Sequence, residues 1–120
     1  RGTNIVMKGP PWIPSTNATG DETVCSTFTH ADAAHLKAQN KSIICQGVIW
    51  AGGQRSHKPK LDTDFVARLH AFLVLCQQNG LHVILDIHQD ACGTAMCGEG
   101  IPHWHTQKHY PHLIGKSGTS

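Results

Sequence analysis

The sequence predicts an α/β fold in which three parallel strands alternate with two helices. Short apolar runs rich in β-branched residues alternate with segments of helical periodicity, and this order favours parallel pairing through crossover connections. Such an arrangement forms either half of a doubly wound sheet or three of the eight units of a β/α barrel. At 120 residues the chain is too short for a complete barrel, which needs about 250, so we expect a piece of a larger fold.

The first strand and the first helix are marked by the residues that bound them. An apolar run over residues 3–7 stops at a glycine and two prolines, residues 9–11, which predicts a buried strand followed by a rigid loop. A polar loop then leads to Thr29. This residue is a suitable N-cap for a helix that continues to about residue 39.

The second strand is predicted over residues 43–50, a β-branched run that ends in Trp50. An alanine and two glycines follow it directly. They predict a mobile loop that extends from residue 51 to about residue 60.

The second helix has the most regular pattern in the chain. Asp62 is its predicted N-cap, and apolar residues recur at helical spacing until Gly80 ends the pattern. A nearly continuous apolar run over residues 81–87 then predicts a third strand that is covered on both faces. Everything after His88 is predicted as loop or short helix.

Charge and hydropathy argue against two classes of partner. The formal net charge is +2, and the 10 Lys and Arg residues are scattered, which argues against nucleic acid or an anionic membrane surface. The longest apolar stretch, residues 71–76, is far shorter than the roughly 18 residues of a membrane span. The chain opens on Arg1 without a signal-peptide pattern, as expected of a processed or excised piece. No feature indicates an oligomeric state.

The cysteines and glycosylation motifs leave the compartment open. Five cysteines and two Asn-x-Ser/Thr triplets, at Asn17 and Asn40, permit a secreted or lysosome-like location without establishing it. Cys92 and Cys97 form a short disulfide in an oxidising compartment or remain free thiols. An alternative is a zinc site built from these cysteines and the tail histidines, although their spacing fits no closed four-ligand pattern. These histidines are His103, His105, His109 and His112.

Reactive residues of parallel α/β folds lie at the carboxyl ends of the strands. The three predicted ends carry Lys8 to Trp12, Trp50 to Gly53, and His88 to Asp90. A sugar-binding cleft requires aromatic faces for the pyranose ring and hydrogen-bonding groups for its hydroxyls. These strand ends therefore indicate a carbohydrate ligand.

Four longer segments contain or follow these strand ends: Lys8-Gly-Pro-Pro-Trp-Ile-Pro-Ser15, Gly47-Val-Ile-Trp-Ala-Gly52, Val83-Ile-Leu-Asp-Ile-His-Gln-Asp90 and Cys97-Gly-Glu-Gly-Ile-Pro-His-Trp104. Together they resemble glycoside hydrolase family 5, and in particular its endoglycoceramidase-like branch. The resemblance implies that residues 1–120 are the N-terminal part of a (β/α)8 TIM-barrel domain, about its first three βα units.

Members of this family cleave glycosidic bonds with retention, using one glutamate after the fourth strand and another after the seventh. The resemblance therefore implies that both catalytic glutamates lie beyond residue 120, and that the only glutamates here, Glu22 and Glu99, have other roles. No cofactor is implied. The expected substrate is a glycosphingolipid or an oligosaccharide.

By the same resemblance, Lys8 hydrogen-bonds a sugar hydroxyl, and His88 and Asp90 line the subsite just before the scissile bond. We add Trp50 as a stacking surface, with a role in the core as its alternative. Trp12 and Trp104 are expected to pack within loops.

Two departures from the family pattern favour a second hypothesis. Cys45 and Gln46 occupy the middle of the second strand, where the family has an arginine that supports the catalytic carboxylates, followed by a leucine. His103 replaces the aspartate of the Gly-Glu-Gly segment. A catalytically impaired relative that binds glycans is therefore the alternative to an active hydrolase.

Overall fold

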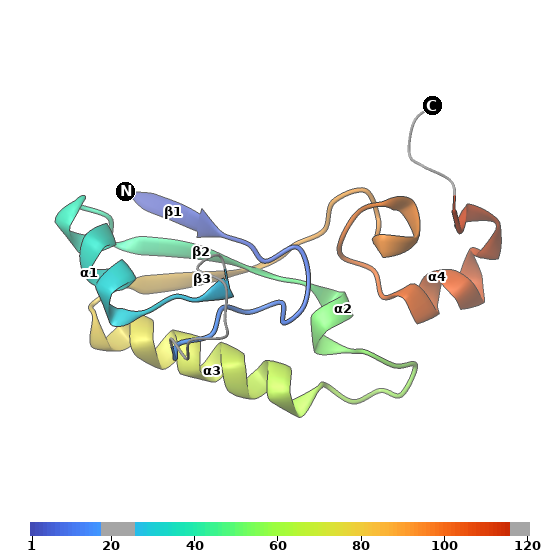
Figure 1. The fold of residues 1–120 in the computed structure, drawn as a ribbon, viewed down its shortest axis with the longest axis horizontal. Coiled ribbons are helices and arrows are strands. Elements are labelled where there is room, and N and C mark those ends of the chain that lie inside the picture. The colour runs from blue at the N-terminus through green and yellow to red at the C-terminus, as the bar shows by residue number, and fades with distance from the viewer. Residues whose placement is uncertain (18–25, 116–120) are drawn as a thin grey trace.

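The computed structural model describes residues 1–17 and 26–115 of the chain. Within these residues a parallel sheet has the strand order β1-β2-β3, formed by β1 (Gly2–Ile5), β2 (Ile43–Val48) and β3 (His82–Ile87). Helices α1 (His30–Ala38) and α3 (Thr63–Gln78) connect the strands, and Figure 1 shows α3 running along the sheet. The predicted alternation of parallel strands and helices is confirmed.

Each helix begins at the residue whose chemistry predicts it. The backbone N–H of Asp32 donates to Thr29 Oγ1, and the Asp32 carboxylate accepts from the Thr29 backbone N–H at 2.8 Å, which is a capping box. At the start of α3, Asp62 Oδ1 accepts from the Phe65 backbone N–H at 2.9 Å. These bonds satisfy amide donors that a helix start leaves without an internal partner.

The hydrophobic core lies between the sheet and the helices. Ile44 of β2 and Phe72 of α3 are fully buried in it, and the Phe72 ring lies 5.2 Å from that of Phe28. Trp12 is 7% exposed and belongs to this core. The sequence predicts that Trp12 packs within a loop; it lies in the loop after β1, but its side chain is part of the main core.

The first two strands end earlier than the apolar pattern predicts. β2 ends at Val48, and Trp50 instead opens the short helix α2 (Trp50–Gly53). A Cβ atom on Gly52 would come within 2.5 Å of the Trp12 ring, so the chain turns here into close contact with the loop after β1. β1 covers Gly2–Ile5 rather than residues 3–7, since Val6 packs across Gly47 instead of extending the strand.

The prediction that the third strand is covered on both faces is wrong. Three apolar side chains of β3 are exposed: Ile84 is 56% exposed, Leu85 46% and Ile87 77%. β3 pairs with β2 along one edge, and no other described strand pairs with its second edge. The continuous apolar pattern therefore marks side chains suited to burial, but the described residues leave several of them exposed.

The residues after β3 form a tight loop and short helices, as predicted. They include the 3-10 helices η2 (Thr94–Met96) and η3 (Pro111–Leu113) and the helix α4 (His103–His109). In Figure 1 this segment lies beyond the carboxyl ends of the strands, at the opposite end from α1. None of the helices in the described part of the chain is long and apolar enough to cross a membrane.

Candidate functional site

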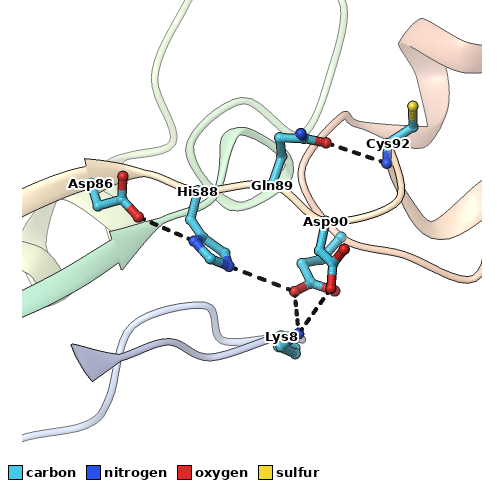
Figure 2. A network of polar contacts seen from close by, with 7 residues as sticks. Lys8, Asp86, His88, Gln89, Asp90 and Cys92 are labelled. Atoms are coloured by element: carbon cyan, nitrogen blue, oxygen red, sulfur yellow. Dashed lines mark hydrogen bonds and ion pairs between the residues drawn. The ribbon is translucent and has the colours of Figure 1, made fainter. Parts of the chain in front are cut away.

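The carboxyl ends of β1 and β3 bring three of the predicted site residues together. Lys8 follows β1, and its Nζ lies 3.4 Å from Oδ2 of Asp90, which follows β3 (Figure 2). His88 directly follows β3, and its backbone N–H donates to the Val48 carbonyl at 3.0 Å. The parallel register therefore places side chains from residues 8 and 88–90 at one edge of the sheet.

Glu99 joins this group, although sequence reasoning gave it no role. Its Oε1 lies 2.8 Å from Lys8 Nζ and 4.0 Å from His88 Nε2, and its side chain is only 8% exposed. The signal that could have found it is the pair of glycines on either side. Small neighbours let the backbone approach another segment closely.

The loop that carries Glu99 closes back on the end of β3. The backbone N–H of Asp90 donates to the Glu99 carbonyl at 2.8 Å, and the Glu99 N–H donates to the Asp90 carbonyl at 2.9 Å. A Cβ atom on Gly98 would lie 2.1 Å from the Asp90 carbonyl oxygen, and Gly100 has a φ of +130°. Only glycine fits both positions, so these two residues fix where Glu99 lies.

Asp86 is a second site residue that the sequence reasoning missed. It lies two residues before His88 on the same face of β3, and its Oδ2 is 3.1 Å from His88 Nδ1. A carboxylate only accepts hydrogen bonds, so Nδ1 carries the proton in this contact. His88 Nε2 is then the nitrogen that faces Glu99.

The Lys8 ammonium group contacts two carboxylates, those of Glu99 and Asp90, and a third carboxylate, that of Asp86, contacts His88. The short polar contact and negative charge of Glu99, followed by the contact with Asp90, raise the pKa of Lys8 above its ordinary value. Lys8 therefore keeps its charge and its donors, while the carboxylates of Asp86, Asp90 and Glu99 offer acceptors. An excess of negative charge suits a neutral, hydroxyl-rich ligand better than an anion.

Trp50 does not join this group in the described part of the chain. Its ring packs edge-on against Trp104 at 6.0 Å and lies 5.0 Å from the ring of His105, and its Nε1 donates to Gln54 Oε1 at 2.8 Å. It remains 38% exposed. The sequence predicts that Trp104 packs within a loop, but it lies in α4 and contacts the segment that begins with α2: its ring meets that of Trp50 and its Nε1 donates to the Gln54 carbonyl.

The structure gives no support to the zinc alternative. Among residues 1–17 and 26–115, no group of three or more His, Cys, Asp or Glu side chains is arranged to hold a metal ion. Cys92 and Cys97 are exposed free thiols. Burial raises the pKa of the Cys76 thiol to about 11, and Cys25 lies outside the described residues.

Cys45 and Gln46 occupy different environments in β2. Cys45 is half-buried, whereas Gln46 is fully buried; the Gln46 Nε2 donates to the Gly47 carbonyl at 2.8 Å. The Gln46 Oε1 is buried without a hydrogen-bond partner. Neither side chain provides a positive charge to support a neighbouring carboxylate.

Comparison with known proteins identifies the family. The family model for cellulase, glycosyl hydrolase family 5, matches residues 9–117. The chain belongs to glycosyl hydrolase family 5. It is 26% identical over 103 residues to an endoglycoceramidase of Hydra vulgaris and 25% identical to one of Cyanea nozakii, covering 86% of this chain in both cases. The chain spans about a fifth of the length of these curated relatives, 19% and 20% respectively.

Solved structures show the same fold. Endo-glycoceramidase II from Rhodococcus sp. superimposes with a TM-score of 0.61 at 23% identity, over 78% of this chain and 23% of that one. An endogalactoceramidase superimposes with a TM-score of 0.65 at 21% identity, over 88% of this chain and 25% of that one. The three strands and their helices are thus part of a TIM-barrel fold, and the resemblance to the endoglycoceramidase-like branch of glycoside hydrolase family 5 is confirmed.

Proposed function

We propose that this chain supplies the sugar-positioning strand ends of a retaining glycoside hydrolase that cleaves O-glycosyl bonds of glycosphingolipids or oligosaccharides. The observation that carries the proposal is the convergence of Lys8, His88 and Asp90 at one edge of the sheet. Membership of glycosyl hydrolase family 5 supports this class of reaction. The names of the Hydra and Cyanea relatives support a glycosphingolipid as substrate.

Each residue has a role that its chemistry supports. The Lys8 side chain is 60% exposed and donates to a sugar hydroxyl, while Asp90, 65% exposed, accepts from another. His88 donates from Nδ1 to Asp86, so its Nε2 accepts a hydrogen bond from a sugar hydroxyl. Trp50, which is partly exposed, offers an aromatic surface for the apolar face of a ring farther along the substrate.

The catalytic glutamates belong, in this proposal, to parts of the barrel outside residues 1–120. A retaining mechanism needs two carboxyl groups about 5–5.5 Å apart, one of them free to attack the sugar. Glu99 is paired with Lys8 and nearly buried, which makes it a poor nucleophile. Glu22 lies outside the described residues.

Titration of the isotope-labelled 120-residue chain with cellobiose and with lactose tests the binding role by amide NMR. We expect saturable shifts at residues 88–90, with Asp90→Asn weakening binding by about tenfold, the loss of one charge-assisted hydrogen bond. Asp64→Asn on α3 is the matched control and leaves the affinity unchanged. Sugar titrations that move no amide of residues 88–90 would overturn the proposal.

A fluorogenic β-glycoside tests the division between sugar positioning and bond cleavage. We expect no release of the fluorophore by the 120-residue chain. Turnover that disappears in Glu99→Gln would show instead that this chain carries its own catalytic carboxylate.

A catalytically impaired, glycan-binding relative is the second candidate. It is favoured by Cys45 and Gln46, which place no positive charge at the middle of β2. Sequencing the transcript beyond Ser120 discriminates the two candidates. An Asn-Glu pair after a fourth strand and a second glutamate after a seventh support the hydrolase, and their replacement by other residues supports the binding protein.

A further inference from the structure

We infer that Glu99 is a positioning residue of this site, which holds the Lys8 ammonium group in place for a sugar hydroxyl. The inference rests on the proposed function, because it explains how Lys8 is held in the position in which it would bind the sugar. It assigns a role to a buried carboxylate that neither strand-end reasoning nor the catalytic scheme of the family uses.

The two carboxylates that contact Lys8 differ in distance and in freedom. Glu99 Oε1 lies 2.8 Å from Lys8 Nζ and its side chain is 8% exposed, whereas Asp90 Oδ2 lies 3.4 Å away on a side chain that is 65% exposed. A buried side chain has already lost its rotamer freedom, while an exposed one still moves. Glu99 therefore anchors the ammonium group, and Asp90 remains available to bind a ligand.

Burial of the Glu99 carboxylate is compensated by Lys8. A buried charge is costly unless it is paired, and apart from the ammonium group Glu99 Oε1 has no hydrogen-bond partner in the described part of the chain. The Lys8 ammonium group therefore directs one of its N–H donors to Glu99. An ammonium group has three donors, so at least one is left for a ligand on the exposed side.

The loop around Glu99 provides the rigidity that a positioning residue needs. Two backbone hydrogen bonds join Glu99 to Asp90, and the Gly100 carbonyl accepts from the Ala51 backbone N–H at 2.8 Å. The loop is therefore fastened both to the end of β3 and to the start of α2. Lys8, on the separate segment after β1, is held to this frame through its side chain.

The test compares Glu99→Gln, which removes the charge but keeps the shape, with Asp90→Asn in the 120-residue chain. Carbon-edited NMR of the lysine ε-methylene follows the titration of Lys8. We expect the pKa of Lys8 to fall in both variants, and to fall further in Glu99→Gln. An unchanged titration of Lys8 in folded Glu99→Gln would show that Glu99 does not act on the ammonium group, and would overturn the inference.

Cellobiose binding provides the second readout. We expect Glu99→Gln to weaken binding by about tenfold, and to cause no further loss in a Lys8→Met background, since Glu99 acts through Lys8. Unchanged binding by Glu99→Gln, with wild-type binding intact, would overturn this inference alone. Failure of the wild-type chain to bind the sugar would overturn the proposed function.

A charge-swapped variant covers the case in which Glu99→Gln does not fold. Lys8→Glu combined with Glu99→Lys keeps the ion pair but moves the cation to the buried position. We expect this variant to fold and to lose cellobiose binding. Binding at wild-type strength by the folded variant would overturn the inference.

Discussion

At the scale of single residues, the site consists of two nitrogen-bearing side chains, Lys8 and His88, each in contact with two carboxylates. Lys8 lies between Glu99 and Asp90, and His88 lies between Asp86 and Glu99. Glu99 is the carboxylate that lies close to both Lys8 and His88. The contacts with Glu99 and Asp90 raise the pKa of Lys8.

We expect the Lys8 ion pair to lose its stabilising effect only in strongly alkaline solution. Contact with Glu99 and Asp90 raises the pKa of Lys8 in the folded protein above its ordinary 10.5. The contribution is thus fully present below the unfolded value and is lost as pH rises through the folded pKa. The free energy of unfolding in urea should fall across this alkaline range in the wild-type chain and in Lys108→Met, a change at an exposed residue of α4, but not in Lys8→Met. Equal slopes in all three proteins would contradict it.

At the scale of elements, the loop between β3 and α4 depends on close backbone contacts. Gly98 lies against the Asp90 carbonyl, at a distance that no Cβ atom tolerates. The same contact supports the paired hydrogen bonds between Asp90 and Glu99. The loop that carries Glu99 therefore has no room for even one added methyl group at residue 98.

Gly98→Ala should open this loop without unfolding the helices. Overpacking of this kind costs about 1–3 kcal/mol, and here the backbone has to separate to make room. Hydrogen exchange of the Asp90 and Glu99 amides should become faster. Gly9→Ala is the control, because a Cβ atom at Gly9 meets nothing within 4 Å. Protection that is equal in the two variants would argue against the close contact.

Local chemistry explains which elements the sequence predicts correctly. Thr29 and Asp62 cap their helices through bonds to residues three positions away, so a short window is enough to recognise them. The end of β2 at Val48 depends on Trp12 packing against Gly52, and the place of Glu99 depends on a loop that returns to Asp90. Such contacts join distant segments, and no periodicity within either segment reveals them.

At the scale of the whole molecule, the described part of the sheet has two unpaired edges, at β1 and at β3, and the edge at β3 is the one with several exposed apolar side chains. The core packs between the sheet and its helices, whereas β3 presents an unpaired edge and exposed Ile84, Leu85 and Ile87 among the described residues. An apolar strand edge is a template for pairing with another chain. Within a complete barrel, such an edge would be covered by the next unit.

The isolated 120-residue chain should therefore self-associate through β3. Removing one buried isoleucine from such an interface costs about 1.5 kcal/mol or more, which is roughly tenfold in association. Ile84→Lys and Ile87→Lys should shift the chain toward monomer in sedimentation velocity. Leu61→Lys, at a residue that is exposed but outside the sheet, should not. A monomeric wild-type chain with a cooperative thermal transition would contradict this expectation.

The buried Gln46 Oε1, which has no hydrogen-bond partner, lowers the free energy of unfolding, and a substitution at this residue can restore it. A buried acceptor without a partner costs about 1–3 kcal/mol, part of which is returned by the bond from Nε2 to Gly47. Gln46→Met keeps the length of the side chain and removes both polar atoms. We expect it to raise the free energy of unfolding by about 1 kcal/mol, as measured by urea denaturation. Gln46 takes no part in the ion pairs around Lys8, so the stabilised chain would be a more tractable background for the other variants, because it tolerates a larger loss of stability before it unfolds.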